Sequence, residues 1–249
     1  MADAAGVQAL LAARLGGPAA AAPQLADETE AYAWQDAVAQ AAGWFGAGPA
    51  RHWKSGGASR QSLQTHAALP PAGVWNHPAD ATHWPFRMRG IEAEIALRLG
   101  QPVDGALAAT LDVDAARRRV DAMCVSIEVV DSRWAEGREA PALAKLADLQ
   151  SHGALVLGEW MPFEPRDWAA QRCAVQIGDD PPLEFTGTHS MADPAWVLPA
   201  WLRHATRQGA VLEAGTVVTT GTWCGLLMAR PGQRVVVRFD GIGEAQLQL

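Results

Sequence analysis

Apolar positions in the first part of the chain recur at the spacing of an α-helix. Over residues 7–15 and 29–45 they return every three or four positions, and Ala, Leu and Gln predominate. This period predicts two helices, and Asp27 or Thr29 is placed to cap the second one. Residues 16–23 between them contain Gly and Pro, which interrupt helices and predict a loop.

The pattern changes further along the chain. Residues 56–85 are rich in Gly, Pro, Ser, Asn and His and show no sustained period, which predicts a long loop region. From residue 88 to 99 apolar and polar positions alternate, as they do in a strand. Further short strands are predicted over residues 124–130, 154–157, 174–177, 183–185, 217–220, 234–239 and 244–249.

Two more helices are predicted in this strand-rich part. One covers residues 112–123, with Asp112 or Asp114 as its cap, and the other covers residues 195–208 after the pair Asp193-Pro194. The mixture of segregated helices and strands indicates an α+β protein. We expect one continuous structural unit, with N-terminal helices and a loop in residues 1–85 and a β-rich core in residues 86–249.

Composition narrows the classes of partner and compartment. With 49% hydrophobic residues and eleven tryptophans the chain can bury a large core, and a formal charge of -7 argues against nucleic acid or an anionic membrane as partner. Cys124, Cys173 and Cys224 are widely spaced, which argues against a disulfide framework. There is no signal-peptide pattern and no long apolar stretch, so we expect a cytoplasmic protein without a membrane partner.

The basic residues are unevenly chosen. The sequence holds eighteen arginines and only two lysines, Lys54 and Lys145. A bias of this kind is expected from the base composition of a genome. A lysine still differs from an arginine, because its ammonium group is compact and its pKa can be adjusted by the surroundings. Each lysine is therefore a candidate for a specific task.

Glu92-Ala93-Glu94 lies inside the predicted strand over residues 88–99. Residues two apart on a strand project from the same face, so the two carboxylates would repel each other unless solvent, a shared proton or a cation intervenes. Hard carboxylate oxygens suit Mg²⁺, Mn²⁺ or Ca²⁺. A solvated outer face of the strand is the alternative.

Glu128 is a third candidate carboxylate. It interrupts the most β-branched run of the chain, where a lone charge is costly unless it is paired or bound to a metal. A salt bridge with Arg133 or Arg98 is the alternative to a three-carboxylate metal site.

Several segments, taken in order, resemble one known family. They are AYAWQ at 31–35, WKSG at 53–56, GIEAEIAL at 90–97, IEVVDSR at 127–133, DLQSHG at 148–153, VLG at 156–158, LEAGTVVTTGT at 212–222 and FDGIG at 239–243. Together they are similar to the 2-keto-4-pentenoate hydratase branch of the fumarylacetoacetate hydrolase superfamily, and the resemblance spans nearly the whole chain. Ordered agreement of this kind is more specific than any single motif.

The resemblance implies a fold, a cofactor and a substrate class. The fold is a mixed β-sandwich or roll core of the fumarylacetoacetate hydrolase C-terminal type with a helical N-terminal segment, in a homo-oligomer. The cofactor is Mg²⁺ or Mn²⁺ on Glu92, Glu94 and Glu128. The partner is a small-molecule 2-oxo or 2-hydroxydienoic acid whose carboxylate and 2-oxygen chelate the ion.

The resemblance also implies roles for further residues. Lys54, Ser151 and His152 are the expected catalytic residues, and Lys54 pairs with the substrate or moves a proton. Gly221, Thr222 and Trp75 are expected to contact the substrate. The chain departs from the family at Leu149, where many hydratases have Asn, and at His152, where a small residue is usual; Trp75 lies in a loop that lacks the acidic residue of the relatives.

The function indicated first is a metal-dependent hydratase, a hydro-lyase in the degradation of aromatic compounds. Decarboxylation or carbon–carbon hydrolysis of a related 2-oxo acid, of the oxaloacetate or acylpyruvate type, is the alternative within the same pocket. A catalytically silent oligomeric binding module is the alternative from another class.

Overall fold

The computed structural model describes residues 3–46 and 48–249. The helices are α1 (Ala4–Arg14), α2 (Glu28–Ala42), α3 (Gly105–Thr110), α4 (Val113–Arg117), α5 (Ala142–Ala147) and α6 (Leu198–Ala205), with short 3-10 helices η1 (Pro71–Gly73), η2 (Gly137–Glu139), η3 (Leu149–Ser151) and η4 (Pro194–Val197). The strands are β1 (His52–Gly56), β2 (Thr65–Ala68), β3 (Val74–Asn76), β4 (Ala79–Asp80), β5 (Gly90–Leu99), β6 (Val120–Val130), β7 (His152–Leu157), β8 (Met161–Pro162), β9 (Arg172–Ile177), β10 (Leu183–Thr186), β11 (Val217–Thr219), β12 (Leu227–Met228), β13 (Arg234–Phe239) and β14 (Gly243–Gln248).

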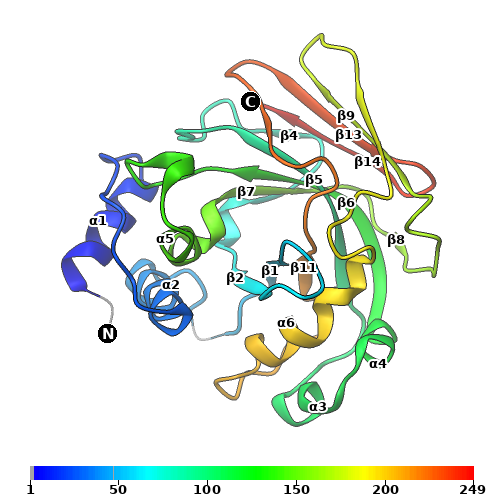
Figure 1. Cartoon of the computed structure of the whole chain (residues 1–249), viewed down its shortest axis with the longest axis horizontal. Coiled ribbons are helices and arrows are strands. Elements are labelled where there is room, and N and C mark those ends of the chain that lie inside the picture. The colour runs from blue at the N-terminus through cyan, green and yellow to red at the C-terminus, as the bar shows by residue number, and fades with distance from the viewer. Residues whose placement is uncertain (1–2, 47) are drawn as a thin grey trace.

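These strands form two sheets. The larger sheet has the order β2-β1-β11-β5-β6-β7-β3, with β12 beside β5 and β8 beside β6. The smaller sheet has the order β10-β9-β13-β14-β4. Figure 1 shows the larger sheet curling between the smaller sheet on one side and the helices on the other. The predicted α+β class and its sandwich or roll core are confirmed.

Alternation along β5 and β6 decides which side chains enter the sandwich. Ile95 of β5 and Val125 and Ile127 of β6 point into one core with Val235 and Val237 of the smaller sheet. The residues between them point to the opposite face, because successive side chains on a strand alternate. That opposite face carries Glu92, Glu94 and Glu128.

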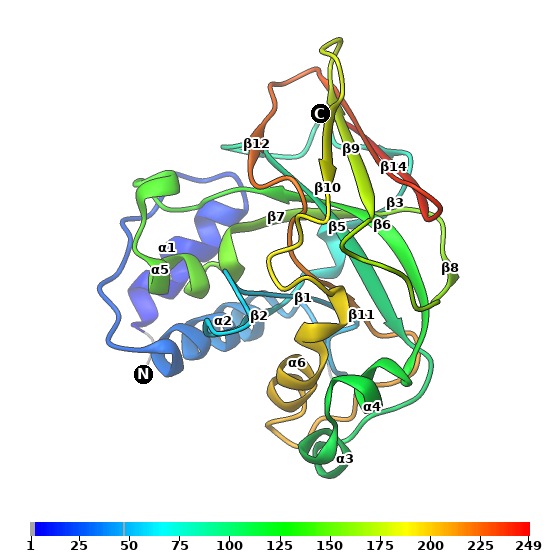
Figure 2. The ribbon, with the colours of Figure 1, turned by 45° about the vertical axis from the view of Figure 1, so that its right-hand side comes forward.

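The N-terminal helices cover part of the opposite face. In Figures 1 and 2, α1, α2 and α5 lie together on one side of the molecule. Their apolar residues form a separate cluster that includes Leu10, Trp34 and Leu146. As predicted, Asp27 caps α2, accepting from the Glu30 amide at 2.9 Å.

Two predictions of secondary structure are wrong. The helix expected over residues 112–123 stops at Arg117, and β6 begins at Val120, because residues 120–130 pair along the length of β5. The loop expected over residues 56–85 contains β2, β3 and β4. These strands have only two to four residues, which is too short for a periodic pattern to show. They exist because they pair with β1, β7 and β14, and local sequence does not reveal that pairing.

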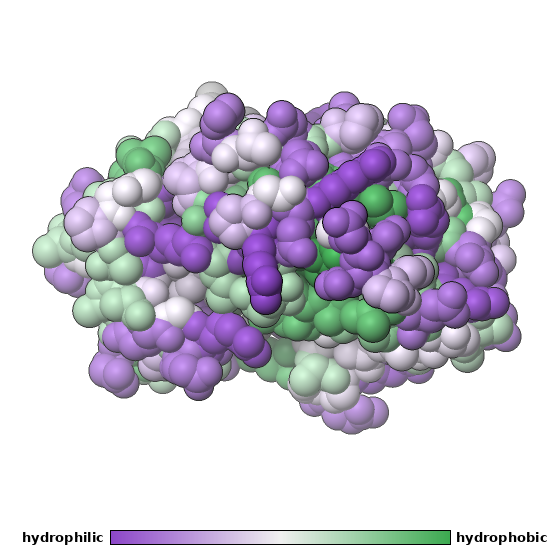
Figure 3. All heavy atoms as spheres, turned by 90° about the horizontal axis from the view of Figure 1, so that it is seen from above, coloured by the Kyte–Doolittle hydropathy of each residue, from purple (hydrophilic) through white to green (hydrophobic). Residues whose placement is uncertain are grey.

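The remaining surface is ordinary for a globular chain. Seen from above in Figure 3, hydrophilic side chains predominate, with smaller hydrophobic areas between them. None of the helices in the described part of the chain combines the length and the apolar character that crossing a bilayer requires. The boundary placed at residue 85 stays a prediction.

Candidate metal centre

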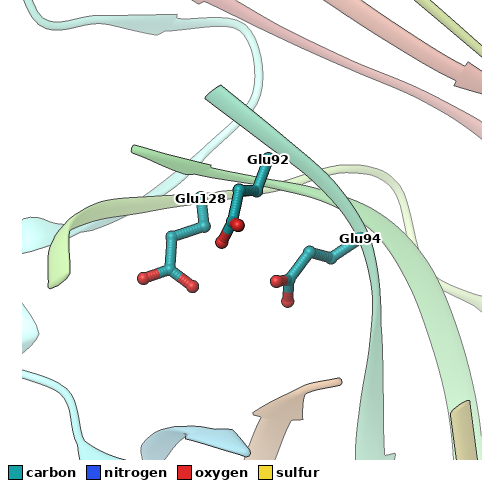
Figure 4. A group of neighbouring side chains, drawn as sticks. All are labelled: Glu92, Glu94 and Glu128. Atoms are coloured by element: carbon teal, nitrogen blue, oxygen red, sulfur yellow. The ribbon is translucent and has the colours of Figure 1, made fainter. Parts of the chain in front are cut away.

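Two paired strands bring three carboxylates to one place. Glu92 and Glu128 are directly opposite partners on the antiparallel strands β5 and β6, and Glu94 lies two residues further along β5. The three side chains therefore share one face of the sheet, and Figure 4 shows them extending toward a common space. One carboxylate oxygen from each lies within 4.8 Å of the others.

Burial makes this arrangement costly. Glu94 and Glu128 are 2% and 0% exposed, and Glu92 is half-buried. Burial, with the charges of Glu94 and Glu128, raises the pKa of Glu92 to about 8. Burial, with the charge of Glu128, raises the pKa of Glu94 to about 7. Burial is the larger cause of both shifts, and the neighbouring carboxylates add to it, so the charge of Lys54 is not enough to keep Glu92 and Glu94 fully ionised near pH 7.

The donor set fits a hard divalent cation. The Oε2 atom of Glu128 is buried and has no hydrogen-bond partner among residues 3–46 and 48–249. A buried carboxylate oxygen without a partner is rare unless an ion or water completes it. Three carboxylates in reach of one point suit Mg²⁺, Mn²⁺ or Ca²⁺. The ion itself stays a prediction.

The outer-face alternative for Glu92 and Glu94 is wrong, whereas Glu128 does form a salt bridge, although with neither of the two predicted arginines. The pair on β5 is not a solvated outer face, since Glu94 is almost wholly buried. Arg98 pairs instead with Asp121 at 2.9 Å, and Arg133 pairs with Asp148 at 2.8 Å. The ion-pair partner of Glu128 is Lys54.

Lys54 comes from the neighbouring part of the same sheet. It lies on β1, whose partner strand β11 pairs with β5. Its Nζ donates to Glu128 Oε1 and to the Gln150 carbonyl, the latter at 3.2 Å. Burial acts to lower the pKa of Lys54, but the charges of Glu128, Glu92 and Glu94 outweigh it and raise the pKa above its usual value. Lys54 is therefore an ammonium ion in this site.

An unusual turn delivers the Gln150 carbonyl. Leu149, Gln150 and Ser151 have φ of 53°, 55° and 58°, three consecutive residues in the left-handed region without a glycine. Such backbone costs roughly 1–2 kcal/mol per residue and persists where the surroundings over-determine it. The left-handed conformation was not predicted; the family resemblance implies that many hydratases have Asn in place of Leu149, and Asn tolerates this region better.

His152 follows the turn and lies behind the carboxylates. It is 1% exposed, and its Nδ1 is 3.2 Å from Glu128 Oε1. Burial lowers its pKa to about 4, so the imidazole is neutral at pH 7. His152 contacts Glu128 and is not part of the cavity lining in the described residues.

Hydrogen bonds from β11 and the residues after it fix Glu94. Its Oε2 accepts from the Gly221 amide at 3.0 Å and from the Thr219 hydroxyl, which also lies 2.9 Å from Ser126 Oγ. The predicted substrate contact Gly221 thus supports a predicted metal ligand. Thr219 was missed by sequence reasoning, because nothing in its strand pattern distinguishes it from its neighbours.

A cavity of about 540 Å³ opens beside Glu92. Ser151 and Gln150 line it, together with side chains of α5 and several apolar residues, namely Leu63, Met88, Val130, Leu143, Leu146 and Leu226. A pocket of this size, with apolar walls and charged and polar side chains among them, can hold a small molecule.

Two predicted substrate contacts lie elsewhere. Trp75 packs edge-on against Trp84, with 4.9 Å between ring centroids, and donates to the Ala72 carbonyl. The Thr222 hydroxyl donates to the Gly225 carbonyl and accepts from the Cys224 amide. In the described residues none of the four predicted substrate contacts, Lys54, Trp75, Gly221 and Thr222, lines the cavity.

Comparison with known families and sequences gives a consistent picture. Residues 46–249 match the family described as fumarylacetoacetate (FAA) hydrolase C-terminal. A 4-oxalocrotonate decarboxylase of a Pseudomonas species is 28% identical over 155 residues, and 2-keto-4-pentenoate hydratase 1 of Dechloromonas aromatica is 31% identical over 156 residues. Each match covers 61% of this chain and 57% of the relative, so the chain spans little more than half of these relatives' length.

Solved structures share the fold. The 4-oxalocrotonate decarboxylase of Pseudomonas putida G7, complexed with calcium and acetate, matches with a TM-score of 0.81 at 18% identity, covering 100% of this chain and 98% of that one. The same decarboxylase also matches in a complex with magnesium and adipate. A fumarylpyruvate hydrolase of Pseudomonas aeruginosa, complexed with Mn²⁺ and pyruvate, matches with a TM-score of 0.56 at 14% identity, covering 80% of this chain and 89% of that one.

Proposed function

The chain belongs to the fumarylacetoacetate hydrolase C-terminal family, and from that premise we propose that it is a divalent-metal-dependent hydratase. Its substrates are 2-hydroxydienoic or 2-oxo-enoic acids such as 2-keto-4-pentenoate, formed during the degradation of aromatic compounds. The observation that carries the proposal is the convergence of Glu92, Glu94 and Glu128 within 4.8 Å beside a cavity. The hydratase relative, at 31% identity, supports the reaction type.

The three glutamates hold the ion, which we take to be Mg²⁺ or Mn²⁺. When bound, the ion would be chelated by the carboxylate and 2-oxygen of a 2-oxo acid, and its positive charge would stabilise the negative charge that develops on the 2-oxygen. The solved relatives that are complexed with calcium, magnesium and Mn²⁺ support a hard divalent cation.

Lys54 supplies a second, fixed positive charge. As an ammonium ion held by Glu128 and the Gln150 carbonyl, it is oriented to attract the substrate carboxylate or its oxo group. Because its donors are already aimed, the site reorganises little when negative charge develops. Lys54 is the catalytic residue we favour.

Ser151 and His152 have different tasks. Ser151 lines the cavity and offers its hydroxyl to the substrate. His152 is shut off from the cavity and contacts Glu128, so we assign it as a positioning residue of that ligand rather than as a proton donor to substrate.

A decarboxylase is the second candidate. It is favoured by the 4-oxalocrotonate decarboxylase relative, which is nearly as similar as the hydratase over the same length. Both reactions need stabilised negative charge on the 2-oxygen, and they differ in where water and protons are placed.

A panel of substrates separates these functions. Purified protein with Mg²⁺ is incubated with 2-hydroxypenta-2,4-dienoate, 4-oxalocrotonate, oxaloacetate and an acylpyruvate, and the ultraviolet band of each is followed. Decay of the first supports the hydratase, and release of carbon dioxide from the second or third supports the decarboxylase. Inactivity toward all four, in a protein that binds Mg²⁺, would leave only the family membership standing.

Metal affinity distinguishes an enzyme from a silent binding module. Calorimetry with Mg²⁺ and Mn²⁺ is expected to show binding that is lost in Glu92→Ala and kept in Glu184→Ala, a change at an exposed carboxylate of β10. No binding to the wild type would favour the module. We also propose a cytoplasmic homo-oligomer, which gel filtration with light scattering tests.

A further inference from the structure

The two lysines of this arginine-rich chain lie in the candidate site and in the cavity beside it. Lys54 lies among the carboxylates, and Lys145, 91 residues later, lines the cavity that opens beside Glu92. The other eighteen basic residues are arginines. The metal centre and the family resemblance account for Lys54 and leave Lys145 without a task.

The position of Lys145 is that of a group facing a ligand. It lies on α5, which also supplies Leu143 and Leu146 to the cavity lining, and it is half-buried. In residues 3–46 and 48–249 no carboxylate oxygen lies within 4.0 Å of its Nζ. An ammonium group on the wall of a cavity, with no carboxylate beside it, can pair with an anion that enters the cavity.

The charged residues that α2 and η2 supply to the lining are more exposed than Lys145. Arg138, on η2, adds a second cation that is likewise without an ion pair in the described part of the chain. Glu28 and Glu139 also line the cavity, but both are exposed, so water and salt screen their charge. Lys145 is the charged side chain of α2, η2 and α5 that lies deepest in this lining.

The same cavity offers two kinds of contact to one molecule. Glu92 and Ser151 mark the end where the chelating 2-oxo acid group is held, and apolar residues such as Met88, Val130 and Leu226 line the wall. A carbon chain against that wall gains from burial. A second anionic group on the same molecule would meet Lys145.

We propose that Lys145 binds a distal carboxylate, so that among the 2-oxo acids of the proposed function the protein prefers a dicarboxylic acid to a monocarboxylic one such as 2-keto-4-pentenoate. The proposal rests on the proposed function, because it takes the metal centre as the binding point of the other end. Lys145 sets specificity in it and takes no part in the bond changes. Arg138 assists at the rim of the cavity.

Two ligands that differ only at the far end test this. 2-Oxoadipate and 2-oxohexanoate share the 2-oxo acid group and chain length, and one ends in a carboxylate where the other ends in a methyl group. Their affinities are measured by calorimetry with saturating Mg²⁺ for the wild type, Lys145→Gln, Lys145→Arg and Arg234→Gln. The last variant removes an exposed charge of β13 and serves as the control.

The wild type and Arg234→Gln are expected to prefer 2-oxoadipate about tenfold or more, as for a hydrogen bond to a charged group. Lys145→Gln should lose that preference without weakening 2-oxohexanoate, and Lys145→Arg should keep most of it. Because the ratio is taken within each variant, a general loss of folding does not imitate the result.

Two outcomes overturn different claims. If the wild type binds both ligands equally, or Lys145→Gln leaves the ratio unchanged, the role of Lys145 is wrong and the metal-dependent function stands. If neither ligand binds the Mg²⁺-loaded wild type, the proposed function fails and the role of Lys145 fails with it.

Discussion

Glu92 and Glu128 face each other as direct partners across the antiparallel strands β5 and β6. Like charges at such a position normally destabilise a sheet, because the two side chains lie close together on the same face. Here Glu94 adds a third carboxylate, and Lys54 compensates only one of the three. The fold therefore holds a concentration of negative charge that a divalent cation would neutralise.

Replacing Glu94 by Gln should separate stability from metal binding. Gln keeps an oxygen that accepts from the Gly221 amide and the Thr219 hydroxyl. It has no negative charge, whereas Glu94 must be ionised in a buried site that raises its pKa to about 7. We expect the metal-free variant at pH 8 to gain about 3 kcal/mol of unfolding free energy. The affinity for Mg²⁺ should fall at least about a hundredfold.

Chemical unfolding with EDTA and with Mg²⁺ measures both effects. Excess Mg²⁺ should raise the stability of the wild type and leave Glu94→Gln unchanged. Glu184→Gln, at an exposed position of β10, is the control and should behave like the wild type. A metal-free Glu94→Gln that is less stable than the wild type would contradict the picture of uncompensated charge.

The fold of β5 and β6 could be predicted to different extents. Alternation along residues 88–99 predicted β5 and the shared face of Glu92 and Glu94. That Glu128 lies opposite Glu92 depends on the register between the strands, which neither segment encodes alone. The local pattern predicts a helix over residues 120–123, but pairing with the long strand β5 overrides that pattern and makes them part of β6.

Other parts of the site lay outside what local sequence specifies. The left-handed turn at Leu149–Ser151 contradicts the preferences of Leu and Gln, so only the surrounding structure can impose it. Gly221 was predicted as a substrate contact from the family motif, yet its amide bonds Glu94. The family motif thus predicted that Gly221 lies near the site, but its role follows from the hydrogen bond that its amide makes in the structure.

Removing the charge of Lys54 should expose the cost of burying Glu128. In Lys54→Met the carboxylate of Glu128 loses its ion-pair partner while it stays 0% exposed. Loss of one member of a buried pair costs about 3–5 kcal/mol. We expect that loss in urea unfolding of the metal-free protein, partial recovery with Mg²⁺, and activity reduced to a few per cent or less.

The control for this prediction is Lys145→Met, which changes the other lysine. It should leave the stability of the protein within about 0.5 kcal/mol of the wild type, since Lys145 has no ion pair within the described residues. Equal stability losses in the two variants would mean that the bond between Lys54 and Glu128 does not matter to the fold.

Glycine at position 150 should relieve the left-handed turn. Gln150 has φ 55° and ψ 41°, which glycine adopts without the clash of a Cβ. Gln150→Gly and Gln150→Ala both lose the hydrogen bond to Thr65 and both keep the carbonyl that accepts from Lys54. We expect the glycine variant to be more stable than the alanine variant by about 1 kcal/mol.

Thermal unfolding of the two variants, side by side, measures this difference. Ala115→Gly within α4 is a useful opposite, since glycine should destabilise an ordinary helical position by about 1 kcal/mol. If glycine is the less stable residue at position 150 as well, the backbone there is not left-handed.

A buried histidine, His66, and a half-buried one, His204, should make the fold sensitive to acid. Burial, with the charges of His204, Arg207 and Arg203, lowers the pKa of His66 to about 3. Burial and Arg207 lower the pKa of His204 to about 3 as well. The rings lie 4.8 Å apart, and His66 Nδ1 is 2.8 Å from Ser55 Oγ. Protonating either ring therefore adds a positive charge where cations already gather.

The sign of the pH dependence follows from these pKa values. A histidine whose pKa is lowered on folding contributes stability that is complete above its unfolded pKa of about 6.5 and is lost as the pH falls toward 3. For His66 alone the loss at pH 5 is about 2 kcal/mol. Urea unfolding between pH 7.5 and 4.5 should show a shallower slope for His66→Gln, whereas the exposed His83→Gln should follow the wild type. Parallel curves for all three proteins would mean that His66 takes up its proton in the folded state without penalty.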